Sequence, residues 1–216
     1  MNGVSTLLEQ AISYAGRSVL DVTPDLLSRP TPCRSWDLGM LLAHASESLS
    51  ALCEATVAGH VALVPEAPDR GGAADPVRAF RGQAGRLLAA RAAAGTGHRI
   101  LDIGDLPLPE IAIDCAGAIE ITVHGWDISQ ACGPRRPIPD ALAAGLLAIA
   151  PLLIPEAGRQ PLFGPPVTTT APAGPGDLLV AYLGRDPGAG PALTKTGEAP
   201  RANESMSSGR QQGGRT

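Results

Sequence analysis

The sequence predicts an all-α protein, built as an up-and-down four-helix bundle with short extra helices and a disordered C-terminal tail. The first reason is composition. The 216 residues are 44% hydrophobic, and alanine and leucine supply most of this fraction, while Phe, Tyr and Trp together make only 3%. Such a core favours packed helices over a β-sandwich. The second reason is the position of the helix-breaking residues, because the 26 glycines and 21 prolines gather between the apolar stretches and in the tail.

The expected helix boundaries follow from capping residues and prolines. Ser35 or Asp37 can cap the second helix, and Asp75-Pro76 is a start signal for the third. Gly133-Pro134 marks the end of the fourth helix. We therefore expect long helices over residues 5–20, 38–57, 76–94 and 110–132, then short helices over residues 140–150, just before Pro151, and over residues 177–183.

The segments between these helices are rich in glycine and proline. We expect a loop over residues 64–75, and either a short extended segment or an irregular crossing loop over residues 98–108. Residues 163–167 (FGPPV) predict an extended segment fixed by prolines. The bundle is expected to fill residues 1–187. Residues 188–216 are rich in Gly, Ser, Arg and Pro and have few apolar side chains, so we expect a disordered tail there.

Composition also argues against several classes of protein. A net charge of −4 does not suit a nucleic-acid partner, which would need a basic patch. No apolar run reaches the roughly 18 residues of a membrane span, and the N-terminus lacks the basic and apolar regions of a signal peptide. We therefore expect a cytoplasmic protein without a membrane partner. No CxxC pair is present, so we expect reduced, mostly buried thiols at Cys33, Cys53, Cys115 and Cys132.

The most informative pair in the chain is Glu120 and His124, four residues apart in a stretch without proline. On a helix, this spacing places the carboxylate and the imidazole on one face. That face is otherwise apolar, so the two groups must either satisfy each other by a hydrogen bond or share a charged partner such as a divalent metal ion.

His44 is the candidate for a third ligand, because it lies in the middle of an apolar helical segment. A single histidine in such a place is more often a core residue with a hydrogen-bond partner than a ligand. A second helix that carries an inward Glu120 and His124 changes this expectation, because bundles bring inward faces together. Two histidines and one carboxylate, with one coordination position open, are the donor set of catalytic zinc sites and of some iron or nickel sites.

Two carboxylates near these ligands are candidate catalytic residues. Glu47 follows His44 by three residues and could be a fourth ligand or a base. Asp127 follows His124 by three residues and could accept a hydrogen bond from its imidazole, although a place on the helix surface is equally compatible with the sequence. His60 and His98 each follow a glycine, and we expect both to be exposed.

Three motifs resemble a known family. TPCRSWDL at residues 31–38 with LLAH at 41–44 resembles the entry motif of the DinB-like proteins of the mycothiol-dependent maleylpyruvate isomerase N-terminal type, and ExxxHxWD at residues 120–127 resembles their second metal motif. FGPPV at residues 163–167 and LGRDP at 183–187 resemble the C-terminal signature of an actinobacterial subgroup described only as metal-binding. The resemblance covers residues 5–187.

The resemblance implies a DinB-like four-helix bundle in which His44, Glu120 and His124 hold zinc, or less often nickel or iron. Members with known activities use a low-molecular-weight thiol such as mycothiol or bacillithiol. The metal would lower the pKa of that thiol and present a thiolate to an electrophile.

The leading functional hypothesis is a divalent-metal-dependent enzyme that acts on a small molecule, by thiol transfer, thiol-assisted isomerisation or hydrolysis by a metal-activated water. Mycothiol is the candidate cosubstrate. The first alternative is a non-catalytic protein that binds a metal or a small ligand, and the second is a tailoring enzyme of a biosynthetic pathway that uses the same site. A third is a structural bundle in which His44 and Glu120 are hydrogen-bonded without metal. The sequence leaves a homodimer open.

Overall fold

The structure of the chain is a computed structural model. It describes residues 3–33, 36–61, 75–95, 99–104, 106–133, 135–157, 159–160, 162–169 and 172–189. The expectations for Ser35, His98, nearly all of the 64–75 loop and the tail beyond residue 189 lie outside these residues.

The described residues form six α-helices, and their bounds lie close to those expected from caps and prolines. The side chain of Asp37 accepts a hydrogen bond from the backbone N–H of Met40 at 2.8 Å, so it caps the second helix. The side chain of Asp75 caps the third helix in the same way, through the N–H of Arg78. The helices are α1 (Gly3–Val19), α2 (Leu38–Ala58), α3 (Pro76–Ala94), α4 (Glu110–Cys132), α5 (Asp140–Leu153) and α6 (Pro175–Tyr182), with a short 3₁₀ turn at Pro24–Leu26.

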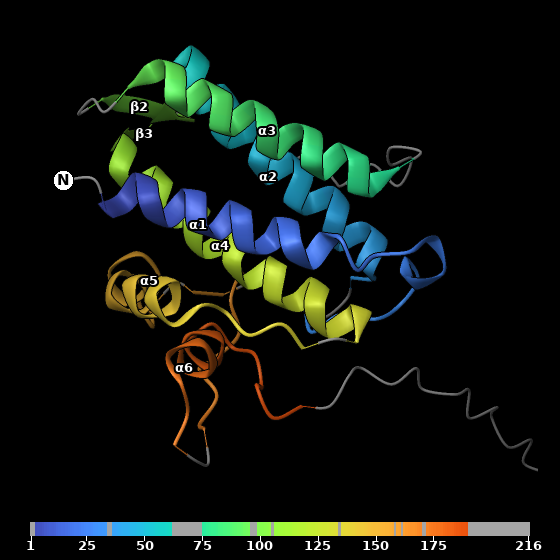
Figure 1. The fold of residues 1–216 in the computed structure, drawn as a ribbon. Coiled ribbons are helices and arrows are strands. Elements are labelled where there is room, and N and C mark those ends of the chain that lie inside the picture. Colours follow the sequence, from blue (N-terminus) through green and yellow to red (C-terminus); the bar gives the residue numbers. More distant parts are fainter. Residues whose placement is uncertain are drawn as a thin grey trace, which may run out of the picture.

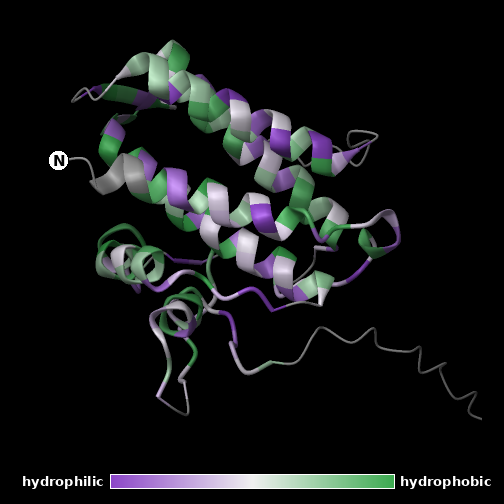
Figure 2. Cartoon of the chain, viewed as in Figure 1, coloured by the Kyte–Doolittle hydropathy of each residue, from purple (hydrophilic) through white to green (hydrophobic). Residues whose placement is uncertain are grey.

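Helices α1 to α4 pack together as the body of the molecule (Figure 1). Helix α1 lies along α4, and α2 lies between α3 and α4, while α5 and α6 pack on each other beside this body. Green, apolar residues alternate with purple, polar ones along the visible faces of these helices in Figure 2, as expected for amphipathic helices around a core.

Helix α4 is the most deeply buried helix, which fixes the place of the Glu120 and His124 pair. Every residue from Gly117 to Ala131 is buried except Glu120. Gly125 lets α1 approach closely, because a Cβ atom at this position would lie 2.9 Å from the Cα of Ala15. The carboxylate of Glu120 is therefore the only acidic group on this stretch of α4 that reaches accessible space.

The expectation of an all-α fold needs a correction, because the described residues include a small three-stranded sheet. Strand β1 (His60–Val61) pairs in parallel with β2 (Ile100–Ile103), which pairs antiparallel with β3 (Leu106–Pro109). The extended alternative for residues 98–108 is therefore confirmed where the structure describes them. These strands are too short to show a clear alternating pattern in the sequence. Strand β3 also contains two prolines and is exposed throughout, so it lacks the usual signals of a strand.

The expected end of α5 was also wrong. The helix continues through Pro151 to Leu153, and the N–H of Ile154 donates to the carbonyl of Ala150 at 2.8 Å. Pro151 removes one backbone hydrogen bond, but it lies in the last turn, where the helix ends within three residues.

The segment over residues 163–167 has no helix or strand, in agreement with the extended conformation expected from its prolines. Its glycine lies against the turn after α6, because a Cβ atom at Gly184 would lie 2.9 Å from the backbone of Gly164, and Gly184 has a φ of 81°. Among the described residues, no helix combines the length and the hydropathy needed to cross a membrane.

Candidate metal site

The three expected ligands come together from two helices. His44 lies on α2, and its Nε2 atom is 2.7 Å from Oε1 of Glu120 on α4. Nε2 of His124 lies 3.3 Å from the same carboxylate oxygen. The ligand atoms of these residues all lie within 4.8 Å of one another. Both histidines thus direct the same ring nitrogen toward one oxygen atom.

Trp36 holds the two imidazole rings from the side. Its ring centroid lies 4.5 Å from that of His44 and 6.1 Å from that of His124. The two imidazoles lie 5.1 Å apart and nearly perpendicular, at 88°. Aromatic packing of this kind restricts the ring rotations, so both Nε2 atoms are oriented before any ligand binds.

A second layer of buried groups lies behind His124. Oδ2 of Asp127 lies 3.1 Å from Nδ1 of His124, and Asp127 is fully buried. Arg185, after α6, donates to both oxygens of Asp127, from Nη2 at 2.9 Å and from Nε at 3.4 Å. Of the two places that the sequence allowed for Asp127, the structure therefore has the buried one beside the imidazole.

This second layer decides which nitrogen of His124 is free. The carboxylate of Asp127 can only accept, so Nδ1 of His124 carries the proton that it receives. In the neutral imidazole, the lone pair is then on Nε2, which faces Glu120. An orienting carboxylate behind a histidine is the usual companion of a metal ligand. Two Nε2 atoms and one carboxylate oxygen at these separations fit a divalent ion such as zinc, nickel or iron.

The charges of the site reinforce one another. Burial opposes the charged form of Glu120, but hydrogen bonds from His124 and His44 outweigh it and hold the pKa of this carboxyl below its ordinary value. Burial likewise opposes a charged His124, but its bonds to Asp127 and Glu120 raise the pKa of this imidazole to about 9. Burial also opposes the charge on Asp127, and the positive charge of Arg185 more than offsets it, which lowers the pKa of Asp127.

Metal binding should therefore release a proton. In the metal-free protein His124 is protonated below its pKa of about 9, whereas a metal ligand must be neutral. At pH values below about 9, we expect the uptake of zinc to release about one proton from His124 and the apparent affinity for zinc to rise about tenfold per pH unit. Calorimetric titrations at pH 7.5 in buffers of different ionisation enthalpy measure this proton. An uptake of zinc with no proton released would contradict the arrangement around His124.

Cys33 lies beside the site. Its Sγ atom forms a second compact group with His124 and Asp127. Burial, followed by the negative charge of Asp127, raises the pKa of this thiol to about 11, so it is protonated at neutral pH. Asp127 is already engaged by Arg185, which makes this group a poorer ligand set than the one that contains Glu120. The other cysteines are free as well. Among the four only Cys115 is buried and the rest are half-buried, so the expectation of mostly buried thiols was wrong.

Glu47 is not brought into the site. It lies exposed on α2, and its neighbour Ser48 instead donates a long hydrogen bond, 3.4 Å, to Oε1 of Glu120. His60 is exposed, as expected. Sequence reasoning assigned no role to Arg185 or Trp36, although both belong to quoted motifs. The signal that could have found Arg185 is that a buried Asp127 requires a cation.

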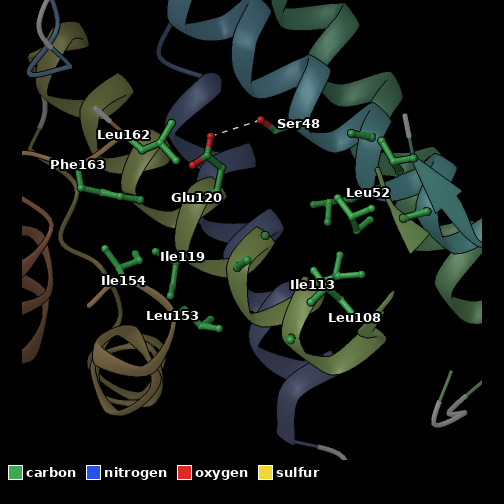
Figure 3. Close-up of a pocket in the computed structure, with 17 residues that line it drawn as sticks. Ser48, Leu52, Leu108, Ile113, Ile119, Glu120, Leu153, Ile154, Leu162 and Phe163 are labelled. Atoms are coloured by element: carbon green, nitrogen blue, oxygen red, sulfur yellow. Dashed lines mark hydrogen bonds between the residues drawn. The ribbon is translucent and has the colours of Figure 1, made fainter. Parts of the chain in front are cut away.

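An apolar cavity of about 530 Å³ opens beside Glu120 (Figure 3). It lies along α2 and α4, and residues of the sheet, the end of α5 and the segment after it complete its wall. Glu120 and Ser48 stand together at one part of this cavity, and the other side chains labelled in Figure 3 are apolar. The site thus has a way in for a small molecule.

The fold and the site define a helical protein with a two-histidine, one-carboxylate set of candidate metal ligands. Residues 8–129 match the family model described as the mycothiol maleylpyruvate isomerase N-terminal domain. Since the match covers more than half of the chain, the protein belongs to this family, as the motifs predicted. The matched region includes all three candidate ligands and Asp127 but ends before Arg185. Comparisons with curated proteins and with solved structures give no match.

Proposed function

We propose that the protein is a divalent-metal-dependent enzyme that acts on a small molecule, with His44, Glu120 and His124 as the metal ligands. The observation that carries this proposal is the convergence of both Nε2 atoms on one oxygen of Glu120, at 2.7 and 3.3 Å, beside a cavity of small-molecule size. Zinc is the first candidate, and nickel or iron is compatible with the same donors.

The open coordination position suits a thiol or a water molecule. When bound, a divalent metal lowers the pKa of such a group and so supplies a thiolate or hydroxide at neutral pH. The family name supports a mycothiol-type thiol as the cosubstrate, with transfer or isomerisation as the reaction. Hydrolysis by a bound water is the second reaction compatible with the same ligands.

The residues of this chain have separate tasks in this proposal. His44 and His124 supply neutral nitrogen donors, and Glu120 supplies one negative charge that partly offsets that of the cation. Asp127 holds the proton on Nδ1 of His124 and fixes its ring, and Arg185 keeps Asp127 ionised. Glu47, exposed on α2, has no task here.

The test measures whether the zinc-loaded protein catalyses the reaction of mycothiol with a small electrophile, such as an activated aryl chloride. We expect the wild-type protein to consume thiol and the His124→Ala variant to lose this activity, while the exposed-histidine variant His60→Ala keeps it. Equal rates in wild type and His124→Ala would contradict catalysis at this site. Bound zinc without turnover of any thiol or ester would favour the alternative, a non-catalytic metal or small-ligand binding protein.

A further inference from the structure

The cavity beside Glu120 has a chemical character that restricts the molecule that enters it. Its volume of about 530 Å³ is that of a site for a small organic molecule. Helix α4 forms its floor with residues four apart, Ala112, Ala116 and Glu120, so that two short side chains lead to the carboxylate. The eight helical steps from Ala112 to Glu120 span about 12 Å.

Short side chains on the facing helix make room for this cavity. Ala51 and Ala55 of α2 line it one turn apart, and Gly117 of α4 is also a lining residue. At Gly117 a Cβ atom would lie 2.7 Å from Cδ1 of Leu52, so the two helices meet there without a gap. The cavity therefore results from small residues on α2 and α4, the two helices that carry the proposed metal ligands.

Almost every side chain that lines the cavity is a hydrocarbon. Among the described lining residues, Ser48 and Glu120 are the only ones with polar side chains, and none is Lys, Arg or His. A carboxylate or phosphate buried there would lose its hydration without gaining a cation, which costs several kcal/mol. The apolar lining consists of Ala51, Leu52, Ala55, Val61, Ile103, Leu108, Ala112, Ile113, Ala116, Gly117, Ile119, Leu153, Ile154, Leu162 and Phe163.

The rim of the cavity continues the same chemistry. Leu162 is 81% exposed, and Leu108 and Leu153 are 37% and 36% exposed. Exposed leucines at the mouth of a cavity favour a hydrophobic molecule at the point of entry. Figure 3 shows Leu162 and Phe163 on the side of Glu120, and Leu108 on the far side.

We propose that the molecule on which this site acts has an uncharged hydrocarbon body that lies along Ala112 and Ala116. This body is a medium-length alkyl chain or a fused ring system of about 12 Å. The single polar group of the molecule lies at Glu120 and Ser48, where the metal ligands converge. The inference rests on the proposed function for the role of the polar group, but the selectivity for the hydrocarbon body depends on the cavity alone. Substrates with a charge at the far end are excluded by the same lining.

The test compares alkyl hydroxamates, which combine a metal-binding head with a chain of chosen length, by calorimetry on the zinc-loaded protein. We expect octyl hydroxamate to bind at least about tenfold more tightly than butyl hydroxamate, because each buried methylene contributes about fourfold. A chain of the same length that ends in a carboxylate should lose this gain. Equal affinity for the butyl and octyl compounds, or for the carboxylate-ended one, would overturn the inference.

Two variants test where the alkyl chain of the ligand binds. Ala116 is accessible and lines the cavity, so Ala116→Phe should fill it and remove the advantage of the octyl chain, while the affinity for zinc stays that of the wild type. Ala89→Phe, on the exposed side of α3, is the matched control and should bind both compounds normally. An unchanged preference for octyl in Ala116→Phe would place the chain elsewhere and contradict the assignment.

Metal-free protein separates this inference from the proposed function. If zinc does not bind, the proposed function fails, but 1-octanol should still bind the metal-free wild type and not Ala116→Phe. If zinc binds and octanol shows no difference between these two proteins, the cavity assignment fails and the metal site stands.

Discussion

His124→Ala is expected to weaken zinc binding by more than about a hundredfold, which exceeds the loss that removal of an orienting partner typically causes. The variant removes one of three donors and also the group that connects Asp127 to Glu120. Competition of the protein with a chromophoric chelator measures the affinity directly. His44→Ala should cause a similar loss, because its Nε2 atom is the donor nearest to the carboxylate of Glu120.

His60→Ala is the matched control for these two variants. It removes an exposed histidine on β1, outside both groups of candidate ligands, and should leave the affinity for zinc unchanged. If all three histidine variants bind zinc like the wild type, then His44 and Glu120 form an ordinary, half-buried hydrogen bond.

Arg185→Leu is expected to destabilise the protein by about 3 kcal/mol, because removal of one partner from a buried ion pair leaves the other charge without compensation. Asp127 is fully buried, and Arg185 contacts both of its oxygens. His124 remains as a second partner, which keeps the cost at the lower end of the usual range. Chemical denaturation of the metal-free protein measures the change in the free energy of unfolding.

The charge itself can be separated from the packing of Arg185. Adding Asp127→Asn to Arg185→Leu removes the uncompensated charge and should recover part of the lost stability, although Asp127→Asn alone destabilises the protein. Arg86→Leu, an exposed arginine on α3, should change the stability little. If the double variant is as unstable as the sum of the two single ones, the two side chains are not coupled.

The helices were predictable from local signals. Asp37 was one of two candidate N-caps for α2, Asp75-Pro76 was a start signal for α3, and α4 begins and ends where its proline and glycine residues place it. The sheet was less predictable, since its strands have two to four residues and depend on pairing between segments far apart in the sequence. The proline inside the last turn of α5 was misread, because the rule against proline holds for helix interiors and weakens near the C-terminus.

The candidate site was predictable only where its residues are close in the sequence. Spacing along one helix was enough to place Glu120 beside His124. Spacing could not show whether Glu47 or Ser48 lies beside Glu120, because both residues are near the face of α2 that carries His44. Only the packing of α2 on α4 leaves Glu47 exposed and turns Ser48 toward Glu120. Arg185 lies 58 residues from Asp127, and no local pattern connects them.

We infer that His44, Glu120 and His124 together bind one divalent metal ion. The most direct test of this inference is elemental analysis of the purified chain after zinc loading and gel filtration, with the melting temperature measured before and after treatment with a chelator. We expect about one zinc per chain and a clear fall in melting temperature when the metal is removed, since a ligand that binds only the folded state stabilises it. No bound metal and an unchanged melting temperature would show that these three residues do not form a metal site.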